Sequence, residues 1–174
     1  VVTEPQQFGG SLRLLEQVAA FTSKPILRKD FIRERQQLID TVQAGASAVL
    51  LIVAILEEGL LEQLFEEAVA LGLEPLVEVH TKKELQRACQ LPLTLLGINN
   101  KDILQLERDS GTVTTTRQLL QHKHDGAFTV SESGIATLAE ANTAMQAGAD
   151  GLLIGTALWQ AAEPAESPGP RPRR

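Results

Sequence analysis

The stretch Pro25–Phe31 (PILRKDF) begins as an ordinary buried strand and ends in charge. Its first three residues suit a strand that enters a core, and Arg28, Lys29 and Asp30 follow where that strand should stop. Charged side chains at the carboxyl ends of parallel strands are typical of an active-site mouth. We therefore expect this tip to belong to a functional site around which the chain is built.

The same design recurs along the chain. Further apolar runs end in polar, charged or glycine-containing groups: Glu78, Asn99 with Lys101, Glu132 with Ser133, and Gly155 with Thr156. The sequence thus predicts several strand tips that share one function.

Strands and helices alternate from one end of the chain to the other. Short apolar runs predict seven strands, over residues 1–3, 25–29, 48–54, 74–79, 93–99, 127–131 and 151–154. Helical spacing and capping signals predict six helices, over residues 11–21, 33–44, 58–71, 81–89, 116–122 and 137–147. Successive strands are far enough apart for a crossover helix, which demands a parallel sheet.

Two α/β architectures satisfy this pattern, an open doubly wound sheet and a (β/α)8 TIM-type barrel. An open sheet would gather its polar groups at one switch point, whereas here nearly every strand ends in one. The sequence therefore favours the barrel, incomplete and with seven parallel strands. We expect one barrel domain over residues 1–160 and a Pro-rich, disordered tail over residues 161–174, after a long polar loop at 101–116.

Composition argues against several classes of function. The formal net charge of −6 is unlike that of a general nucleic-acid binder, and no apolar run is long enough to cross a bilayer. Cys89 is the only cysteine, which excludes an intramolecular disulfide and fits a cytoplasmic protein. His122 and His124 lie in a polar loop, where we interpret them as solvated, so no metal site is expected.

Two glycine-containing segments near the end of the chain predict a phosphate site. They are 131–135 (SESGI) and 148–156 (GADGLLIGT), and each joins a strand to a following helix. Glycines let backbone N–H groups approach an anion, and helix N-termini add partial positive charge. Tight turns that merely need glycine are the alternative interpretation, but barrels often hold phosphate after their last two strands.

Lys29, Glu78 and Glu132 are ionisable residues on three different strands. A carboxylate on the inner face of a strand is costly unless it is paired or used, and a facing Lys and Glu can act as acid and base. A structural ion pair that braces the barrel is the alternative. Asn99 and Lys101 add an amide and a second cation, or else simply form a turn.

Taken together, these motifs resemble one enzyme family. PILRKDFI, LLIVAIL, GLEPLVEVHT, LGINNKD, SESGI, GADGLLIGTAL and the TEPQQFGGS loop occur in the order and spacing of indole-3-glycerol-phosphate synthase, from residue 1 to about residue 159. The resemblance implies a (β/α)8 barrel of tryptophan biosynthesis that needs no cofactor. It also implies closure of the pyrrole ring of 1-(2-carboxyphenylamino)-1-deoxyribulose 5-phosphate, with loss of CO₂ and water.

The resemblance implies a role for each candidate residue. Lys29 matches the general acid of ring closure and Glu78 the carboxylate that works with it, while Asn99 and Glu132 match polar residues of the same pocket. The remaining matches are substrate contacts at Phe31, Leu50, Lys101 and Ser133, and a phosphate cradle at Gly134, Gly155 and Thr156.

The chain departs from the family in three respects. Lys101 stands where the family usually has Arg, which keeps the charge but loses the planar fork. We find no counterpart of the family's N-terminal helix, first strand and first helix, and that strand carries a second catalytic Lys and a Glu. The Pro-rich tail replaces the last outer helix. Because the missing strand would close the barrel, we expect open edges at residues 1–3 and 151–154. The chain is then either a shortened form of a longer enzyme or an incomplete barrel that self-associates through this seam.

Two other functions stay open at this point. Another phosphate-binding barrel enzyme, such as phosphoribosylanthranilate isomerase or a sugar-phosphate epimerase, would share the cradle but not the PILRKDF and EPLVEV pair. A non-catalytic binder of a phosphorylated small molecule would fit the lack of the first-strand Lys.

Overall fold

The computed structural model describes residues 1–101, 104, 112–122 and 126–158. The predicted tail at 161–174 and most of the predicted loop at 101–116 lie outside the described residues.

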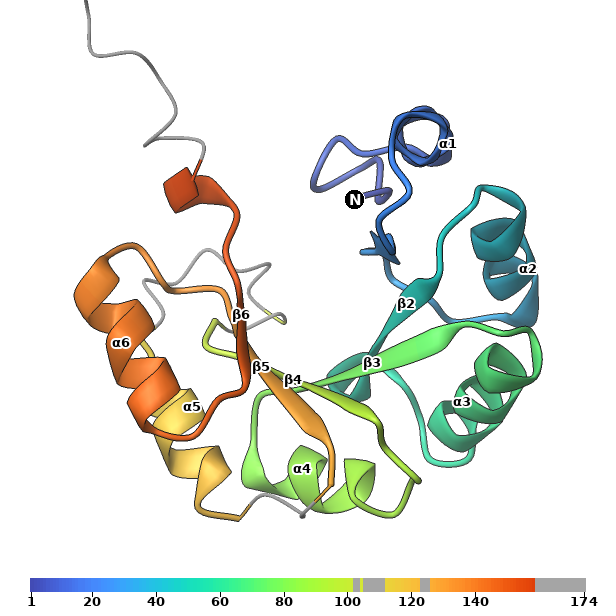
Figure 1. Ribbon diagram of the computed structural model, residues 1–174. Helices are drawn as coiled ribbons and strands as arrows, with labels where there is room; N and C mark the ends of the chain where they lie inside the picture. The colour runs from blue at the N-terminus through green and yellow to red at the C-terminus, as the bar shows by residue number, and fades with distance from the viewer. Residues whose placement is uncertain (102–103, 105–111, 123–125, 159–174) are drawn as a thin grey trace, which may run out of the picture.

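Parallel strands form a single curved sheet, and most of the helices stand on its outer side (Figure 1). The strands are β1 (Leu27–Arg28), β2 (Ala48–Ile52), β3 (Glu74–Val79), β4 (Leu95–Asn99), β5 (Phe128–Glu132) and β6 (Gly151–Leu153). The helices are α1 (Leu12–Phe21), α2 (Arg35–Gln43), α3 (Leu60–Ala70), α4 (Lys82–Ala88), α5 (Thr114–Leu120) and α6 (Leu138–Gln146), with a 3-10 turn η1 (Val53–Ile55). Each strand pairs in parallel with the next one along the chain, in the order β1-β2-β3-β4-β5-β6. This is the α/β barrel topology that the sequence predicts.

All six predicted helices are present, because the local capping signals act as expected. The Ser11 hydroxyl accepts a hydrogen bond from the N–H of Leu14 at the start of α1. Thr81 and Glu84 form the predicted cap of α4, with the Thr81 hydroxyl accepting from the N–H of Glu84. Gly72 follows α3 at a φ of +80°, a left-handed conformation that glycine adopts without strain.

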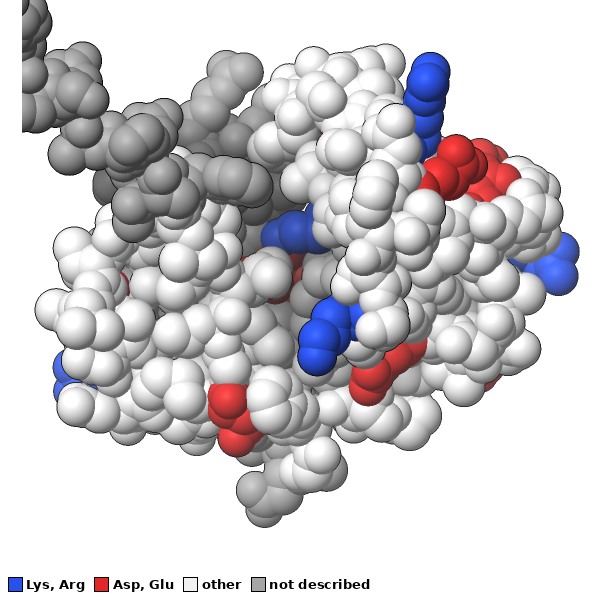
Figure 2. All heavy atoms as spheres, turned by 45° about the horizontal axis from the view of Figure 1, so that its top comes forward, with Lys and Arg blue, Asp and Glu red and all other residues white. Residues whose placement is uncertain are grey.

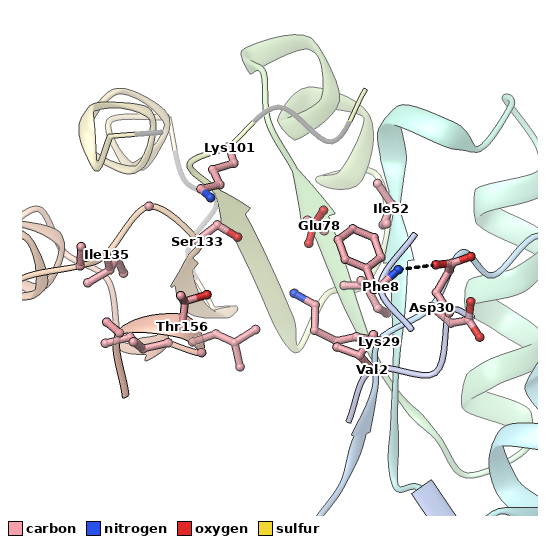
Figure 3. A pocket seen from close by; sticks show the side chains of 18 of the residues that line it. Val2, Phe8, Lys29, Asp30, Ile52, Glu78, Lys101, Ser133, Ile135 and Thr156 are labelled. Carbon is pink, nitrogen blue, oxygen red and sulfur yellow. Dashed lines mark hydrogen bonds between the residues drawn. The ribbon is translucent and has the colours of Figure 1, made fainter. Parts of the chain in front are cut away.

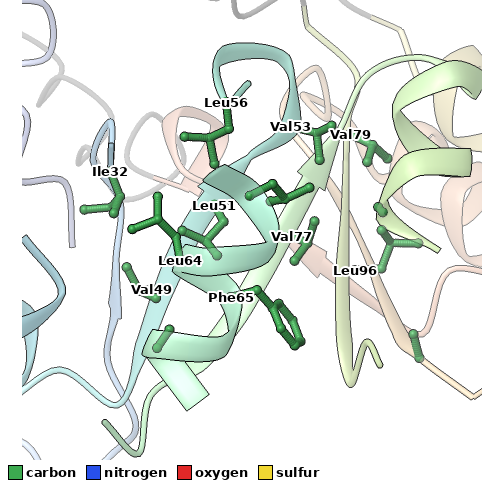
Figure 4. Close-up of a cluster of buried hydrophobic side chains, with 14 of the residues drawn as sticks. Ile32, Val49, Leu51, Val53, Leu56, Leu64, Phe65, Val77, Val79 and Leu96 are labelled. Atoms are coloured by element: carbon green, nitrogen blue, oxygen red, sulfur yellow. The ribbon is translucent and has the colours of Figure 1, made fainter. Parts of the chain in front are cut away.

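The core lies between the outer face of the sheet and the helices (Figure 4). Along β2, Val49 and Leu51 face this core, whereas Leu50 and Ile52 belong to a separate cluster on the inner face. Both faces of β2 are therefore buried, which explains why its sequence is continuously apolar and does not alternate. A third cluster, around Leu15, packs α1 against the beginning of β1.

One predicted strand is shorter than expected. Residues 1–3 form an isolated parallel bridge between Val2 and Lys29, so the sheet has six strands and not seven. The N–H of Thr3 donates to the carbonyl of Lys29, and the N–H of Lys29 donates to the carbonyl of Val1. The pairing ends there because the Glu4 side chain folds the following residues into a turn.

The sheet does not close within the described residues. Strand β6 pairs with β5, and no pairing joins it to the segment around Val2 on the far side. The fold is thus an incomplete barrel whose two edges face each other across the opening seen in Figure 1.

Candidate functional site

A cavity of about 520 Å³ lies at the carboxyl ends of the strands, within the size range of small-molecule sites. One face of the molecule is hollowed near its middle, and charged atoms of both signs are visible inside the hollow (Figure 2). The predicted site residues that line the cavity are Lys29, Phe31, Leu50, Glu78, Lys101, Ser133, Gly134, Gly155 and Thr156. Asn99 and Glu132 do not line it. The fold thus brings together residues from all parts of the chain.

Lys29 and Glu132 form an ion pair across the inner side of the sheet. The Lys29 ammonium lies 2.7 Å from Oε2 of Glu132, and the Glu132 side chain is fully buried, whereas that of Lys29 is 23% exposed. The buried carboxylate thus lies behind the lysine and is not among the residues that line the cavity. In Figure 3 the ammonium of Lys29 points toward the middle of the cavity, which places a cation within reach of a bound ligand.

Gly97 of β4 makes room for this carboxylate. A Cβ atom at Gly97 would stand less than 3.0 Å from Oε1 of Glu132, closer than real Cβ contacts. Gly97 pairs in register with Glu78 of β3, so the two carboxyl-bearing residues flank the same glycine. The absence of a side chain at Gly97 lets the Glu132 carboxylate take this place on the inner face, a requirement that the sequence alone did not reveal.

Glu78 is linked to helix α4 through His80. Its Oε1 lies 3.4 Å from Nε2 of His80, and Nδ1 of His80 lies 3.2 Å from Oε2 of Glu84. Burial raises the pKa of Glu84, but hydrogen bonds from the His80 side chain, the His80 N–H and the Thr81 hydroxyl outweigh it and hold that pKa below its ordinary value of 4.5. The imidazole is thereby held beside a candidate catalytic carboxylate.

A buried network behind Lys29 fixes the end of β1. The Arg28 guanidinium donates to the Asp30 carboxylate at 2.7 Å, to the Thr3 hydroxyl at 2.9 Å, and to the Thr41 hydroxyl at 3.0 Å. The Thr3 hydroxyl donates to the same Asp30 oxygen at 2.6 Å. Because successive side chains of a strand point to opposite sides, the Arg28 side chain faces away from the cavity while Lys29 faces it, and Asp30, the partner of Arg28, stands at the border of the cavity. The three adjacent charges of the PILRKDF motif therefore have two different tasks.

The phenyl rings of Phe8 and Phe31 lie together on one side of the cavity, with centroids 6.2 Å apart at an interplanar angle of 57°. Phe8 sits on a turn closed by Glu4, whose carboxylate accepts hydrogen bonds from the N–H groups of Gln6, Gln7 and Phe8. Burial raises the pKa of Glu4, but these hydrogen bonds, the one from Gln7 first, hold it below the usual value. The TEPQQFGGS loop was among the motifs that resemble the family, but its residues Phe8 and Glu4 were not among the residues predicted for the site.

The other side of the cavity carries polar residues and glycines among apolar ones, and Ser133 and Thr156 face Lys29 across it (Figure 3). Ser133 has a φ of +59°, the only positive φ of a non-glycine residue in the described part of the chain, and Gly134 follows at +62°. The N-terminus of α6 is already capped, because the Thr137 hydroxyl accepts a hydrogen bond from the N–H of Glu140 and the Glu140 carboxylate accepts one from the N–H of Thr137. Backbone groups of the turn, and not this helix end, are therefore the anion-binding candidates here.

Asn99 and Glu132 are buried beneath the cavity, paired in register on β4 and β5. The Asn99 side-chain oxygen accepts a hydrogen bond from the N–H of Lys101 at 2.9 Å, which shapes the turn that brings Lys101 to the cavity. Within the described residues there is no cluster of three or more His, Cys, Asp or Glu side chains suited to a metal ion. None of the described helices combines the length and apolar character needed to cross a membrane.

Comparisons with known protein families and with curated proteins point to the same family. The model of the family "Indole-3-glycerol phosphate synthase" matches residues 1–167. The indole-3-glycerol phosphate synthase of Pyrococcus furiosus is 46% identical over 166 residues, which cover 95% of this chain and 72% of the relative. That of Staphylococcus haemolyticus is 43% identical over 163 residues, covering 94% of this chain and 62% of the relative.

The chain belongs to the indole-3-glycerol phosphate synthase family. The members are carboxy-lyases of tryptophan biosynthesis that act on a phosphorylated small molecule. The chain spans between 60% and 72% of the length of the curated relatives that it matches.

A solved structure supports the fold of this family member independently. A mutant tryptophan synthase α-subunit from Pyrococcus furiosus superposes with a TM-score of 0.65 at 14% sequence identity, over 86% of this chain and 63% of that one. At this identity the likeness concerns the fold alone, and it agrees with an incomplete TIM-type barrel.

The Gly97→Ala variant tests the packing of Glu132. We expect it to lower the free energy of unfolding by about 1–3 kcal/mol, as overpacked cores do. In a Glu132→Asp background the shorter side chain vacates the space, so the same substitution should cost less. Urea unfolding of the four proteins measures the difference, and equal costs in both backgrounds would contradict the contact.

The Glu84→Gln variant tests the link between β3 and α4 through its pH dependence. The folded pKa of Glu84 lies below that of the unfolded chain, so its stabilisation is complete above about pH 4.5 and is lost as the pH falls through the folded pKa. We therefore expect the variant to be less stable than the parent near neutral pH, with a gap that narrows in acid. Thermal unfolding along a pH series measures it, and Glu66→Gln on the exposed side of α3 is the control. A gap that does not change with pH would refute the role of the charge.

Proposed function

We propose that this chain carries out the reaction of its family, the closure of the pyrrole ring of 1-(2-carboxyphenylamino)-1-deoxyribulose 5-phosphate. The observation that carries the proposal is the Lys29 ammonium, held at the cavity by a buried carboxylate 2.7 Å away and aimed at the middle of the cavity (Figure 3). A cation fixed in this way is suited to protonate an oxygen on which charge develops.

The cavity has two sides that match the two ends of this substrate. The side formed by Phe8, Phe31 and Leu50 suits the carboxyphenyl ring, which would pack against apolar side chains. The side formed by the turn at Ser133 and Gly134 and by Gly155 with Thr156 suits the phosphate, with Lys101 as a second cation. A substrate that spans the cavity in this orientation places its carbonyl near Lys29.

The chemistry then needs one proton donor and one group that exchanges protons. The ring carbon that bears the carboxylate attacks the sugar carbonyl carbon, and Lys29 donates a proton to the carbonyl oxygen as the C–C bond forms. Loss of CO₂ restores the aromatic ring. The new hydroxyl then takes up a proton and leaves as water, and the neighbouring CH₂ carbon beside the nitrogen releases a proton, which completes the pyrrole. Glu78, buried and lining the cavity beside Lys29, is the carboxylate proposed to exchange protons in these steps. Asn99 and Glu132 act from beneath, through the turn of Lys101 and through Lys29.

A phosphate-ligand binder without turnover is the alternative, because the turn at Ser133 and Gly134 with Gly155 and Thr156 could hold a phosphate without any reaction. A cytoplasmic location is part of the proposal, supported by the single cysteine, Cys89, which is free in the structure.

We also propose that the chain self-associates through the open side of the sheet. Within the described residues β6 pairs only with β5, and parallel edges of this kind invite pairing with another chain. Two helices stand beside the two edges (Figure 1) and expose large apolar side chains, with Phe21 91% and Leu138 78% exposed. Burial of these side chains against a second copy would remove apolar surface from water.

The Lys29→Ala variant tests the reaction. We expect it to lower kcat by about 10²-fold or more, the scale of a lost general acid, while substrate binding persists. Indole fluorescence that develops on incubation with the carboxyphenylamino deoxyribulose phosphate measures turnover, and Lys24→Ala, on the connection before β1, is the control. Turnover that survives Lys29→Ala would refute the assignment of the acid. Binding without turnover in the parent chain would favour the non-catalytic alternative.

The double variant Phe21→Lys with Leu138→Lys tests self-association. We expect the parent chain to sediment as a dimer or larger species at micromolar concentration and the double variant to sediment as a monomer. Val69→Lys, a change at an exposed apolar position on α3, should leave the parent behaviour unchanged. A parent chain that is monomeric at every concentration would overturn the proposal.

A further inference from the structure

A buried polar cluster lies between β4, β5 and helix α5, on the opposite side of the sheet from the cavity. Its centre is Asn100, the residue directly after β4, which is 5% exposed. Thr116 of α5 and Ser131 of β5 are fully buried beside it. Buried polar groups of this kind are costly unless each has a partner, so the cluster calls for an explanation.

Every polar atom of the Asn100 side chain is used. Its Nδ2 donates to the carbonyl oxygens of Glu132 at 3.0 Å and Ser133 at 3.1 Å, and lies 3.0 Å from the hydroxyl of Ser131. Its Oδ1 accepts from the N–H and the hydroxyl of Thr116 at 3.1 and 2.9 Å. These partners fix which way the amide faces, because a flipped amide would set its oxygen against two carbonyl oxygens.

The main chain of Asn100 adds to the same clamp. Its N–H donates to the carbonyl of Glu132 at 2.9 Å, so that carbonyl accepts from both the backbone and the side chain of one residue. Two successive carbonyls, those of Glu132 and Ser133, are therefore held by a single asparagine.

The direction of these carbonyls sets the direction of the next N–H groups. In a trans peptide the C=O of one residue and the N–H of the following residue point in opposite directions, and the described chain contains no cis peptide. The N–H groups of Ser133 and Gly134 then point away from Asn100, and both residues line the cavity. Consecutive N–H groups that converge on one point form an anion-binding concavity.

The same clamp explains the backbone of Ser133. Its φ of +59° is disfavoured for a residue with a Cβ atom and persists only where surrounding contacts impose it. The hydrogen bond from Asn100 to the Ser133 carbonyl is such a contact, and it acts at the residue whose conformation turns the chain toward Gly134.

We propose that Asn100 is a positioning residue that holds the Ser133–Gly134 turn so that its backbone N–H groups bind the phosphate of the substrate. The inference rests on the proposed function for the identity of the ligand. It needs no contact between Asn100 and the substrate, and it gives the second Asn of the GINNKD motif a task distinct from that of Asn99.

The alternative is that Asn100 merely fastens α5 to the sheet. Variants at Thr116 and Asn100 distinguish this structural role from the positioning role. Thr116→Val removes the hydroxyl that bonds Asn100 and Ser131 but keeps the backbone N–H that orients the Asn100 amide. Asn100→Asp keeps the shape and the acceptor side but replaces the donor with an oxygen that faces two carbonyls. Both variants loosen the helix, and only the second releases the turn.

The experiment measures the affinity of the whole chain for inorganic phosphate and for glycerol 3-phosphate by calorimetry, with the Gly134 amide followed by NMR. We expect Asn100→Asp to weaken phosphate binding about tenfold or more and to abolish the phosphate-induced shift of the Gly134 amide. Thr116→Val should change the affinity less than about twofold. Should Asn100→Asp fail to fold, Asn100→Ser, which is uncharged, takes its place with the same expected loss.

A second substitution that restores phosphate affinity gives a further test, because a purely structural role of Asn100 predicts no such recovery. Glycine adopts a positive φ without strain, so Ser133→Gly should recover part of the phosphate affinity in the Asn100→Ser background and gain none in the parent.

Phosphate affinity that is unchanged in the Asn100 variants, or lost equally in Thr116→Val, would overturn the inference, as would a parent chain that binds no phosphate. Asn100-dependent phosphate binding without turnover would refute the proposed reaction and keep the inference. Turnover at an unchanged KM in Asn100→Asp would keep the proposed reaction and refute the inference about Asn100.

Discussion

The ion pair between Lys29 and Glu132 can form only because the sheet is curved, and the same curvature defines the fold. The two residues are 103 positions apart, and the sheet order places three strands between β1 and β5. In a flat sheet four spacings of about 4.8 Å would separate them by about 19 Å, far beyond the reach of the two side chains. The observed 2.7 Å is possible only because the sheet curls around its inner face. The same curvature gathers the strand tips around one cavity.

Polar side chains on the two faces of the sheet have different roles. On the inner face, the Glu132 carboxylate takes the space left by Gly97 and pairs with Lys29, and Glu78 lies in register with the same glycine. On the outer face, the buried side chains of Arg28 and Asn100 hold the backbone through hydrogen bonds, Arg28 behind Lys29 and Asn100 behind Ser133. Because side chains alternate along a strand, a reactive residue and its support can be neighbours in sequence. This explains why charged and amide residues stand in pairs or triplets at the strand tips.

Much of the architecture could be predicted from local signals. The Ser11 and Thr81 caps and the glycine after α3 mark helix ends through contacts within a few residues, so all six helices were predicted. The strand expected at residues 1–3 was wrong in extent, because the pairing of Val2 is cut short by the turn that the Glu4 carboxylate organises. Phe8 was missed for the same reason, since its place in the cavity depends on that turn and on the distant ring of Phe31.

The sequence by itself determined the α/β alternation, the parallel sheet, the tips that face one cavity and the membership of the family, because each follows from short-range periodicity or from motifs in a fixed order. Only the tertiary structure decided which carboxylate Lys29 meets, why Gly97 has no side chain, and how Asn100 reaches the carbonyls of Glu132 and Ser133. These contacts join residues that are tens of positions apart. They are set by the curvature and register of the sheet, which no local stretch of sequence encodes.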